Sequence, residues 1–144
     1  MSIAGASFGD GATTHFDGNL MIGGILIQGG GTPSTIATAG PVTYTPAQLL
    51  SGLILRDPAG ASRSDVTPSA TALANAVPGA AAGTAFEFAI RNDAGGAFTI
   101  TVTAGAGATL SGTMTIAQST MRTFRVVFTS ASAYTLYSLG SVTF

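Results

Sequence analysis

Short runs in which large apolar residues alternate with small or polar ones most restrict the fold of this chain. The pattern occupies residues 86–90, 98–103 and 121–129, and clusters of turn-forming residues such as 92–96 separate the runs. A period of two places neighbouring side chains on opposite faces of an extended chain, as in a half-buried β-strand. We therefore predict a mainly β fold, an antiparallel β-sandwich or a small jelly-roll-like β-barrel, in which 86–90 and 98–103 form a hairpin.

One or two short helices are predicted beside the strands. Thr45 is an N-cap residue, Pro46 suits the first helical position, and Gly52 follows where a helix of about one turn would end. In the segment 67–78 a Thr-Pro pair begins the helix and Pro78 ends it. Short strands are predicted at 42–44 and 53–56, and a polar loop at 57–65.

The start of the chain has a different composition. Residues 1–31 are dense in glycine but also carry large apolar side chains, and 32–40 is a linker of Pro, Thr, Ser and Ala. Ordering glycine-rich backbone is entropically costly, whereas a solvated linker seldom contains so many apolar groups. We predict an N-terminal arm and linker over 1–41, which orders against a partner, and a β-domain over 42–144. The candidate partner contacts of the arm are Phe8, Phe16, Ile22, Ile25 and Ile27.

Charged residues make up only 8% of the chain, and all five basic residues are arginine. Ordinary soluble domains contain about 25% charged residues. Because interface cores are depleted in lysine and glutamate, we predict that neighbouring subunits cover much of this surface. A secreted protein kept soluble by hydroxyl groups is the alternative.

Several classes of function are disfavoured by composition. The net charge of -1 argues against nucleic-acid binding, which needs clustered basic residues. The longest apolar stretch, 20–27, is much shorter than the roughly 20 residues that a membrane helix needs. Cysteine is absent, which excludes disulfides and thiolate metal sites.

Residues that could carry catalysis are few. His15, the only histidine, lies near Asp10 and Asp17, but metal sites need three or four ligands on a rigid scaffold, and an ordinary polar contact is the preferred interpretation. A serine triad would need the same histidine, and no G-x-S-x-G motif is present. Glu87 could serve a two-carboxylate glycosidase, but the alternation places it on an outward face. We predict no enzyme, no metal, no cofactor and no small-molecule substrate.

One polar cluster stands out between the predicted strand 53–56 and the second helix. It consists of Arg56, Asp57, Arg63 and Asp65. Arginine forks pair with carboxylates and carbonyl groups in a fixed geometry, so the cluster suits a loop held rigid by an internal ion-pair network. A direct contact with a partner remains the alternative.

Four segments resemble small β-rich virion proteins of tailed bacteriophages. They are YTPAQLLSGLILR at 44–56, DVTPSA at 65–70, FEFAIRN at 86–92 and VTAGAGATLSG at 102–112. This group includes capsid decoration (cement) proteins and head- or tail-fibre domains. The resemblance spans 42–144 and leaves the arm outside, and it is a pattern of strands and turns without catalytic residues.

The resemblance implies a protein made in the host cytoplasm that sits on the capsid surface of the virion, often as a homotrimer. It would bind the major capsid protein and stabilise the phage head. The alternative is a head- or tail-fibre domain that binds a host surface glycan, although the chain has no tryptophan and only three tyrosines to form a sugar platform. A secreted carbohydrate-active enzyme that uses Glu87 is a third hypothesis.

Overall fold

The computed structural model describes residues 31–144 of the chain. Nine strands and two helices follow one another in this part of the sequence. Their order is β1 (Ser34–Ile36), α1 (Pro46–Leu50), β2 (Leu53–Arg56), β3 (Arg63–Val66), α2 (Ala70–Ala76), β4 (Ala85–Asn92), β5 (Ile100–Thr103), β6 (Ala108–Ser111), β7 (Thr115–Ile116), β8 (Thr120–Ser130) and β9 (Ala133–Thr143).

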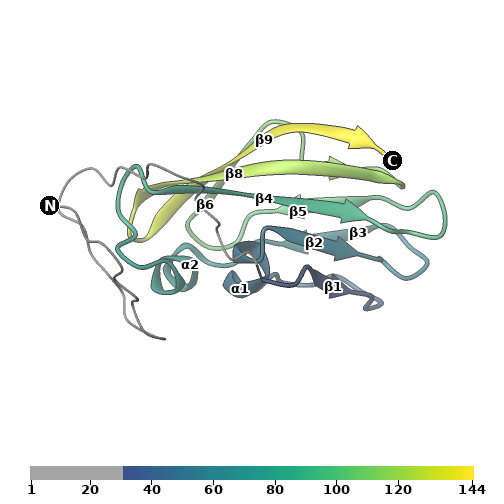
Figure 1. Cartoon of the computed structure of the whole chain (residues 1–144), viewed down its shortest axis with the longest axis horizontal. Helices are drawn as coiled ribbons and strands as arrows, with labels where there is room; N and C mark the ends of the chain where they lie inside the picture. The colour runs from purple at the N-terminus through teal and green to yellow at the C-terminus, as the bar shows by residue number, and fades with distance from the viewer. Residues whose placement is uncertain (1–30) are drawn as a thin grey trace, which may run out of the picture.

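The strands form two sheets. The larger has six strands in the order β1-β2-β4-β8-β9-β6, and the smaller has three in the order β3-β5-β7. Figure 1 shows β1 at one edge of the larger sheet and β9 towards the other edge. The predicted mainly β fold with two short helices is confirmed, and the pair of sheets is compatible with a sandwich-like arrangement.

Strand directions are more mixed than the antiparallel fold that we predicted. The pairs β4–β8, β8–β9 and β5–β7 are antiparallel, but β1–β2, β2–β4, β3–β5 and β6–β9 are parallel. Parallel neighbours need a long crossover connection. Helix α1 lies in the crossover from β1 to β2, and α2 lies in the crossover from β2 to β4. Alternation of side chains reveals a strand but not its direction relative to a neighbour.

The predicted hairpin of β4 with β5 is wrong, because these strands belong to different sheets. Buried Asn92 holds the connection between them. Its Nδ2 donates to the carbonyl oxygens of Phe98 at 2.9 Å and Ile116 at 3.0 Å, and its Oδ1 accepts from the Ala94 N–H at 3.0 Å. One amide side chain thus satisfies three backbone groups where the chain passes from one sheet to the other.

Local signals located the first helix well and the second less well. Helix α1 has the predicted Thr45 cap: its Oγ1 accepts from the Gln48 N–H, and the Gln48 side chain accepts from the Thr45 N–H. Helix α2 instead begins at a Ser69 cap. Thr67, the predicted cap, accepts a hydrogen bond from the Gly105 N–H at 2.9 Å and so belongs to the contact with the loop before β6.

Two strands lie where loops were predicted. β1 falls in the 32–40 linker and pairs with β2, so the larger sheet begins before the predicted domain boundary at Val42. β3 falls in the end of the predicted 57–65 loop and pairs with β5. The predicted strand 42–44 is reduced to one bridge between Thr43 and Val66.

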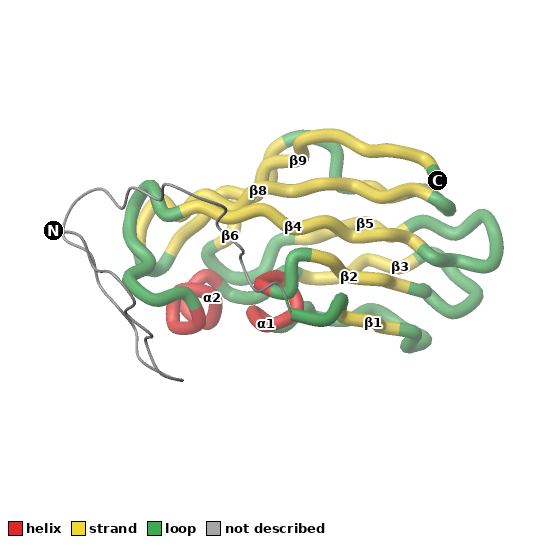
Figure 2. Tube along the Cα trace, viewed as in Figure 1, coloured by secondary structure: helices red, strands yellow, loops and turns green. Residues whose placement is uncertain are grey.

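Both sheets and both helices contribute to one hydrophobic core. Helices α1 and α2 lie beside each other near one end of the sheets (Figure 2) and bury Leu49 and Leu73. The largest fully buried apolar side chains of the core are Tyr44, Leu49, Ile54, Leu73, Ile90, Ile100, Ile116, Phe124, Phe128, Tyr134 and Leu136. Because burial of these groups supplies most of the driving force for folding, the inner face of the larger sheet is committed to the core, and its other face remains available to partners.

Candidate functional site

The predicted polar cluster is mostly an internal structure. Arg56 and Asp65 are both completely buried, and the Arg56 Nε donates to Asp65 Oδ2 at 2.8 Å. Arg56 also donates to the carbonyl oxygens of Thr38 at 2.9 Å and Gly40 at 2.8 Å, which lie between β1 and α1. A buried charge is tolerated when it is paired and fully hydrogen-bonded, as it is in this cluster.

The carboxylate of Asp65 has two further donors. Its Oδ1 accepts from the Val42 N–H at 3.0 Å, and its Oδ2 accepts from the Tyr44 hydroxyl at 2.9 Å. Burial, together with the negative charge of Asp65, raises the pKa of the Tyr44 hydroxyl far above its usual value. The cluster therefore ties the segment before α1 to both sheets, and its buried members are out of reach of a partner.

The two other members of the cluster hold the loop between β2 and β3. Asp57 Oδ1 accepts from the Ala59 N–H at 2.9 Å, and the Arg63 Nε donates to the Pro58 carbonyl oxygen at 3.1 Å. These contacts lie within the loop itself. The structure thus brings Arg56 and Asp65 together and places Asp57 and Arg63 in separate local contacts.

The remaining sequence candidates do not form a reactive site in residues 31–144. Glu87 pairs with Arg125 of the neighbouring strand at 3.1 Å, and both side chains are about half exposed. No group of three or more metal-ligating side chains occurs in this part of the chain. The predicted arm contacts Phe8, Phe16, Ile22, Ile25 and Ile27, and the histidine site of Asp10, His15 and Asp17, lie outside the described residues.

One face of the larger sheet is not packed against the smaller sheet; we call it the outer face. Strand register aligns its residues in rows that cross four strands: one row is Leu55, Arg91, Met121 and Val142, and the next is Leu53, Ala89, Thr123 and Gly140. These residues are half-buried or exposed. Of the residues between them on the other face, Ile90 of β4 enters the core, whereas Arg122 of β8 is only half-buried and donates to Ser138 Oγ at 2.8 Å. These two rows are mainly apolar, and Arg91 and Thr123 are their polar members.

The charges of the outer face neutralise one another. Glu87 pairs with Arg125, and Arg91 pairs with Asp93 at 2.6 Å. The Arg91 guanidinium also lies 4.0 Å from the centroid of the Phe144 ring, in cation–π contact. Covering a paired charge costs less than covering an unpaired one, because the opposite charge stays beside it when water is removed.

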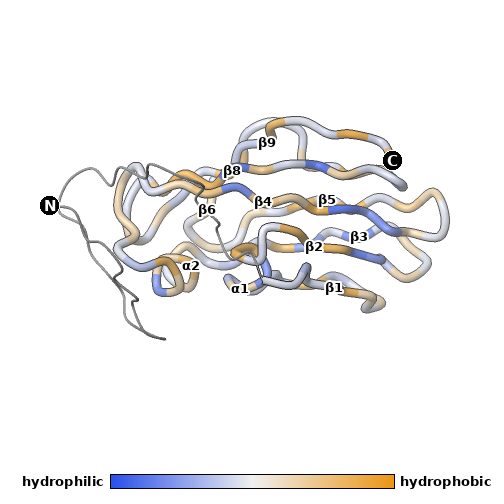
Figure 3. Tube along the Cα trace, viewed as in Figure 1, coloured by the Kyte–Doolittle hydropathy of each residue, from blue (hydrophilic) through white to orange (hydrophobic). Residues whose placement is uncertain are grey.

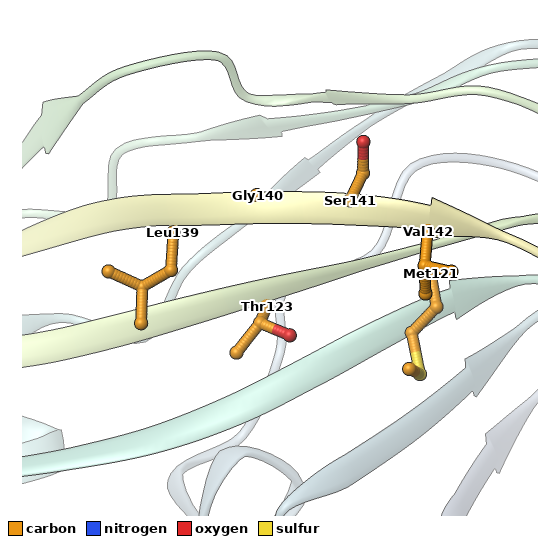
Figure 4. Close-up of a pocket in the computed structure, with 6 residues that line it drawn as sticks. All are labelled: Met121, Thr123, Leu139, Gly140, Ser141 and Val142. Atoms are coloured by element: carbon orange, nitrogen blue, oxygen red, sulfur yellow. The ribbon is translucent and has the colours of Figure 1, made fainter.

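A shallow hollow of about 310 Å³ lies in the outer face where β8 meets β9. Figure 4 shows Met121, Thr123, Leu139 and Val142 on one side of the two strands and Ser141 on the other. A register shift after Ser138 leaves Leu139 without a partner in β8, consistent with its position on the same side as Val142. Gly140 lies opposite Thr123 and has no side chain, so the space above this residue pair stays open.

β9 has an unpaired edge beside this hollow. β8 pairs with β9 along nearly its whole length, but β6 covers the other edge of β9 only from Tyr134 to Tyr137. Gly112, just after β6, approaches Ser138. Beyond it, residues 139–143 have no strand neighbour on that side among the described residues; we call this the open edge.

Sequence reasoning did not find the open edge, although a signal was present. Residues 126–144 contain no charged side chain. Within them Leu139 is 52% exposed and Val142 is 54% exposed, and hydrophobic positions recur along β9 towards the C-terminus (Figure 3). An uncharged stretch that ends in exposed apolar residues indicates a contact surface rather than a solvated strand.

Within residues 31–144 no helix has both the length and the hydropathy needed to cross a membrane. Comparison of the chain with protein-family models, with curated proteins and with solved structures finds no match in any of the three.

Proposed function

We propose that this protein is a non-enzymatic virion structural subunit, a capsid decoration protein that binds the lattice of the major capsid protein and stabilises a phage head. The observation that carries the proposal is the outer face, a wide apolar sheet surface whose four charged side chains are paired with one another. Such a surface is suited to lie flat against another folded protein.

The scarcity of charge over the whole chain supports the same function. Of the five arginines, three are paired with acidic residues within residues 31–144, one of them in the buried pair with Asp65. Few ionic groups therefore remain to keep a free subunit dispersed. We propose the capsid as the specific partner because the strand and turn segments resemble those of phage virion proteins.

Decoration would stabilise a shell by mass action. A subunit that binds only the assembled lattice lowers the free energy of that lattice and leaves the dissociated capsid protein unaffected. The apolar rows of the outer face would supply the contact, at about 25 cal/mol for each Å² of apolar surface buried.

The glycan-binding alternative has weaker support. Sugar platforms use exposed aromatic rings, yet Tyr44 and Tyr134 are each only 1% exposed. Of the three tyrosines of the chain, only Tyr137, at 41% exposure, reaches the surface. We therefore do not favour a fibre domain that binds host glycans.

The proposal is tested with the virus particles that carry the protein. Cryo-electron microscopy should show the two-sheet fold at repeated positions on the outside of the capsid, with its outer face towards the shell. Purified Leu53→Glu protein should not bind shells that lack the subunit, because a carboxylate would be buried in the contact. Leu50→Glu, which changes a 41% exposed leucine on α1, is the matched control and should bind normally. Absence of the chain from capsids, or normal binding by Leu53→Glu, would refute the proposal.

A further inference from the structure

We propose that the open edge of β9 pairs antiparallel with the same edge of a second copy of this chain, so that two six-stranded sheets join across a twofold axis. The pairing specifies how the subunits of the proposed assembly associate, as twofold pairs and not as the homotrimer that the resemblance implies, and in that sense it rests on the proposed function. The contact would be isologous, since both copies use the same residues.

The open edge lacks the features that normally prevent such pairing. Natural edge strands are short or carry charges or proline, because an exposed row of backbone N–H and C=O groups invites another strand. β1, the opposite edge of the same sheet, has only three residues and follows Pro33. Residues 139–143 contain neither a charged residue nor a proline. β6, the edge strand beside β9, has only four residues. Residues 139–143 continue the longer strand β9 beyond the end of β6, without the protection of shortness, charge or proline.

Centring the twofold axis on Ser141 makes the two copies complementary. Ser141 then faces Ser141 of the second copy, and Gly140 faces Val142 of the second copy. Directly opposed residues of an antiparallel pair share one face of the sheet. Val142 of the second copy would therefore lie beside the hollow over Gly140 on the outer face, and the reverse contact would fill the other hollow. Two exposed valines and two hollows would be removed from water together.

Because residues 139–143 are uncharged, the favoured partner for the open edge is the same strand of a second copy. On the outer face, a charged side chain of a partner strand would be buried against Leu139, Gly140 and Val142, which offer no opposite charge. Arg122 lies on the other face, beside Ser141, and donates to Ser138 and Ser141. A second copy brings the same uncharged residues and the same small side chain at Gly140. The backbone hydrogen bonds of the new pair would satisfy groups that now face water, and the apolar contact would supply the net gain.

The first test measures the oligomeric state of the full-length chain by light scattering and sedimentation. We expect a dimer for the wild type and a monomer for Val142→Lys, because each ammonium group would be buried beside an apolar hollow and the two would be diagonal neighbours across the axis. Leu50→Lys places the same charge on α1, away from the edge, and should remain a dimer. Val142→Ala should weaken dimerisation by about tenfold or more, since buried methyl groups are lost from both copies. Circular dichroism of each variant should show the wild-type β spectrum.

A second test determines the register. The chain has no cysteine, so a single introduced thiol reports one contact. Directly opposed residues lie about 4.5–5.5 Å apart between Cα atoms, within the range that a disulfide spans. Ser141→Cys should form a crosslinked dimer under mild oxidation, whereas Leu50→Cys should not.

The outcomes separate this inference from the proposed function. A wild-type monomer or trimer, or a Val142→Lys protein that remains dimeric, would overturn the edge pairing. Failure of Ser141→Cys to crosslink would overturn the twofold register. A dimer that behaves as expected but never binds a capsid would leave the pairing intact and refute the decoration function alone.

Discussion

The Arg56 Nε lies 2.8 Å from Asp65 Oδ2, and this fully buried ion pair joins the two sheets. Arg56 ends β2 of the larger sheet, and Asp65 lies in β3 of the smaller one. Because the carbonyl oxygens of Thr38 and Gly40 also accept from Arg56, the same pair fixes the chain between β1 and α1.

Replacing Asp65 with asparagine should destabilise the fold strongly. The change leaves the Arg56 guanidinium buried without an opposite charge, which typically costs about 3–5 kcal/mol of the free energy of unfolding. Glu87→Gln breaks a half-exposed pair and should cost less than about 1 kcal/mol. Guanidinium chloride denaturation of both variants measures the difference. Equal small losses would show that the buried pair does not hold the sheets together.

Alkaline pH should lower stability through the buried tyrosines. Burial raises the pKa of Tyr44, with a further contribution from Asp65, and burial also raises the pKa of Tyr134. The unfolded chain releases these protons near pH 10 while the folded chain retains them. The contribution of the two tyrosines to the free energy of unfolding is therefore constant below that pH and falls above it. Each group contributes up to about 1.4 kcal/mol for each pH unit above pH 10.

Tyr44→Phe separates the two effects of this hydroxyl. At pH 8 the variant should be less stable than the wild type, because Asp65 loses a hydrogen bond of 2.9 Å. Between pH 9 and pH 11 its stability should fall less steeply, because one titrating group is gone. Urea denaturation at intervals of half a pH unit tests this, and identical slopes for the two proteins would contradict it.

Gly105 should not tolerate a side chain. An added Cβ would lie 2.8 Å from the Pro68 carbonyl oxygen and closer still to that of Thr67. Because the displaced atoms are backbone that cannot rotate away, Gly105→Ala should cost about 1–3 kcal/mol. Gly95→Ala, where nothing lies within 4 Å, should change stability by no more than about 0.5 kcal/mol. Thermal denaturation distinguishes them, and similar melting temperatures would contradict the close packing of this loop.

Deletion of residues 1–31 should leave the β-domain folded and abolish decoration. The core described above draws its buried side chains from Ile36 onward, so cooperative unfolding should persist. Binding of the truncated and full-length chains to capsids that lack the subunit can be compared by sedimentation. Wild-type occupancy by the truncated chain would show that the arm is not needed for the contact.

The parts of the fold that were predicted correctly depend on neighbours in the chain. The cap of α1 needs only Thr45, Pro46 and Gln48, which lie within one turn of helix. The long strands β4 and β8 were visible because β4, and β8 from Phe124 onward, alternate between core and surface. Such signals depend on local geometry and persist whatever the rest of the chain does.

Other features were missed because their partners are distant in sequence. β1 and β3 are short, and their composition is that of a linker or loop until they pair with β2 and β5. The interpretation of Asp65 as part of a polar loop could not include its burial against Arg56 and Tyr44. The open edge of β9 exists only because β6 stops pairing at Tyr137.

Residue order alone therefore determined that this chain forms strands and two short helices, since those depend on side-chain periodicity and capping. Tertiary structure decided which strands are neighbours, in which direction they run, and which edge and face remain uncovered. The physical reason is that a strand makes its ladder hydrogen bonds with other strands, which can lie far along the chain. Which surfaces remain for a partner is known only after all of those pairings are made.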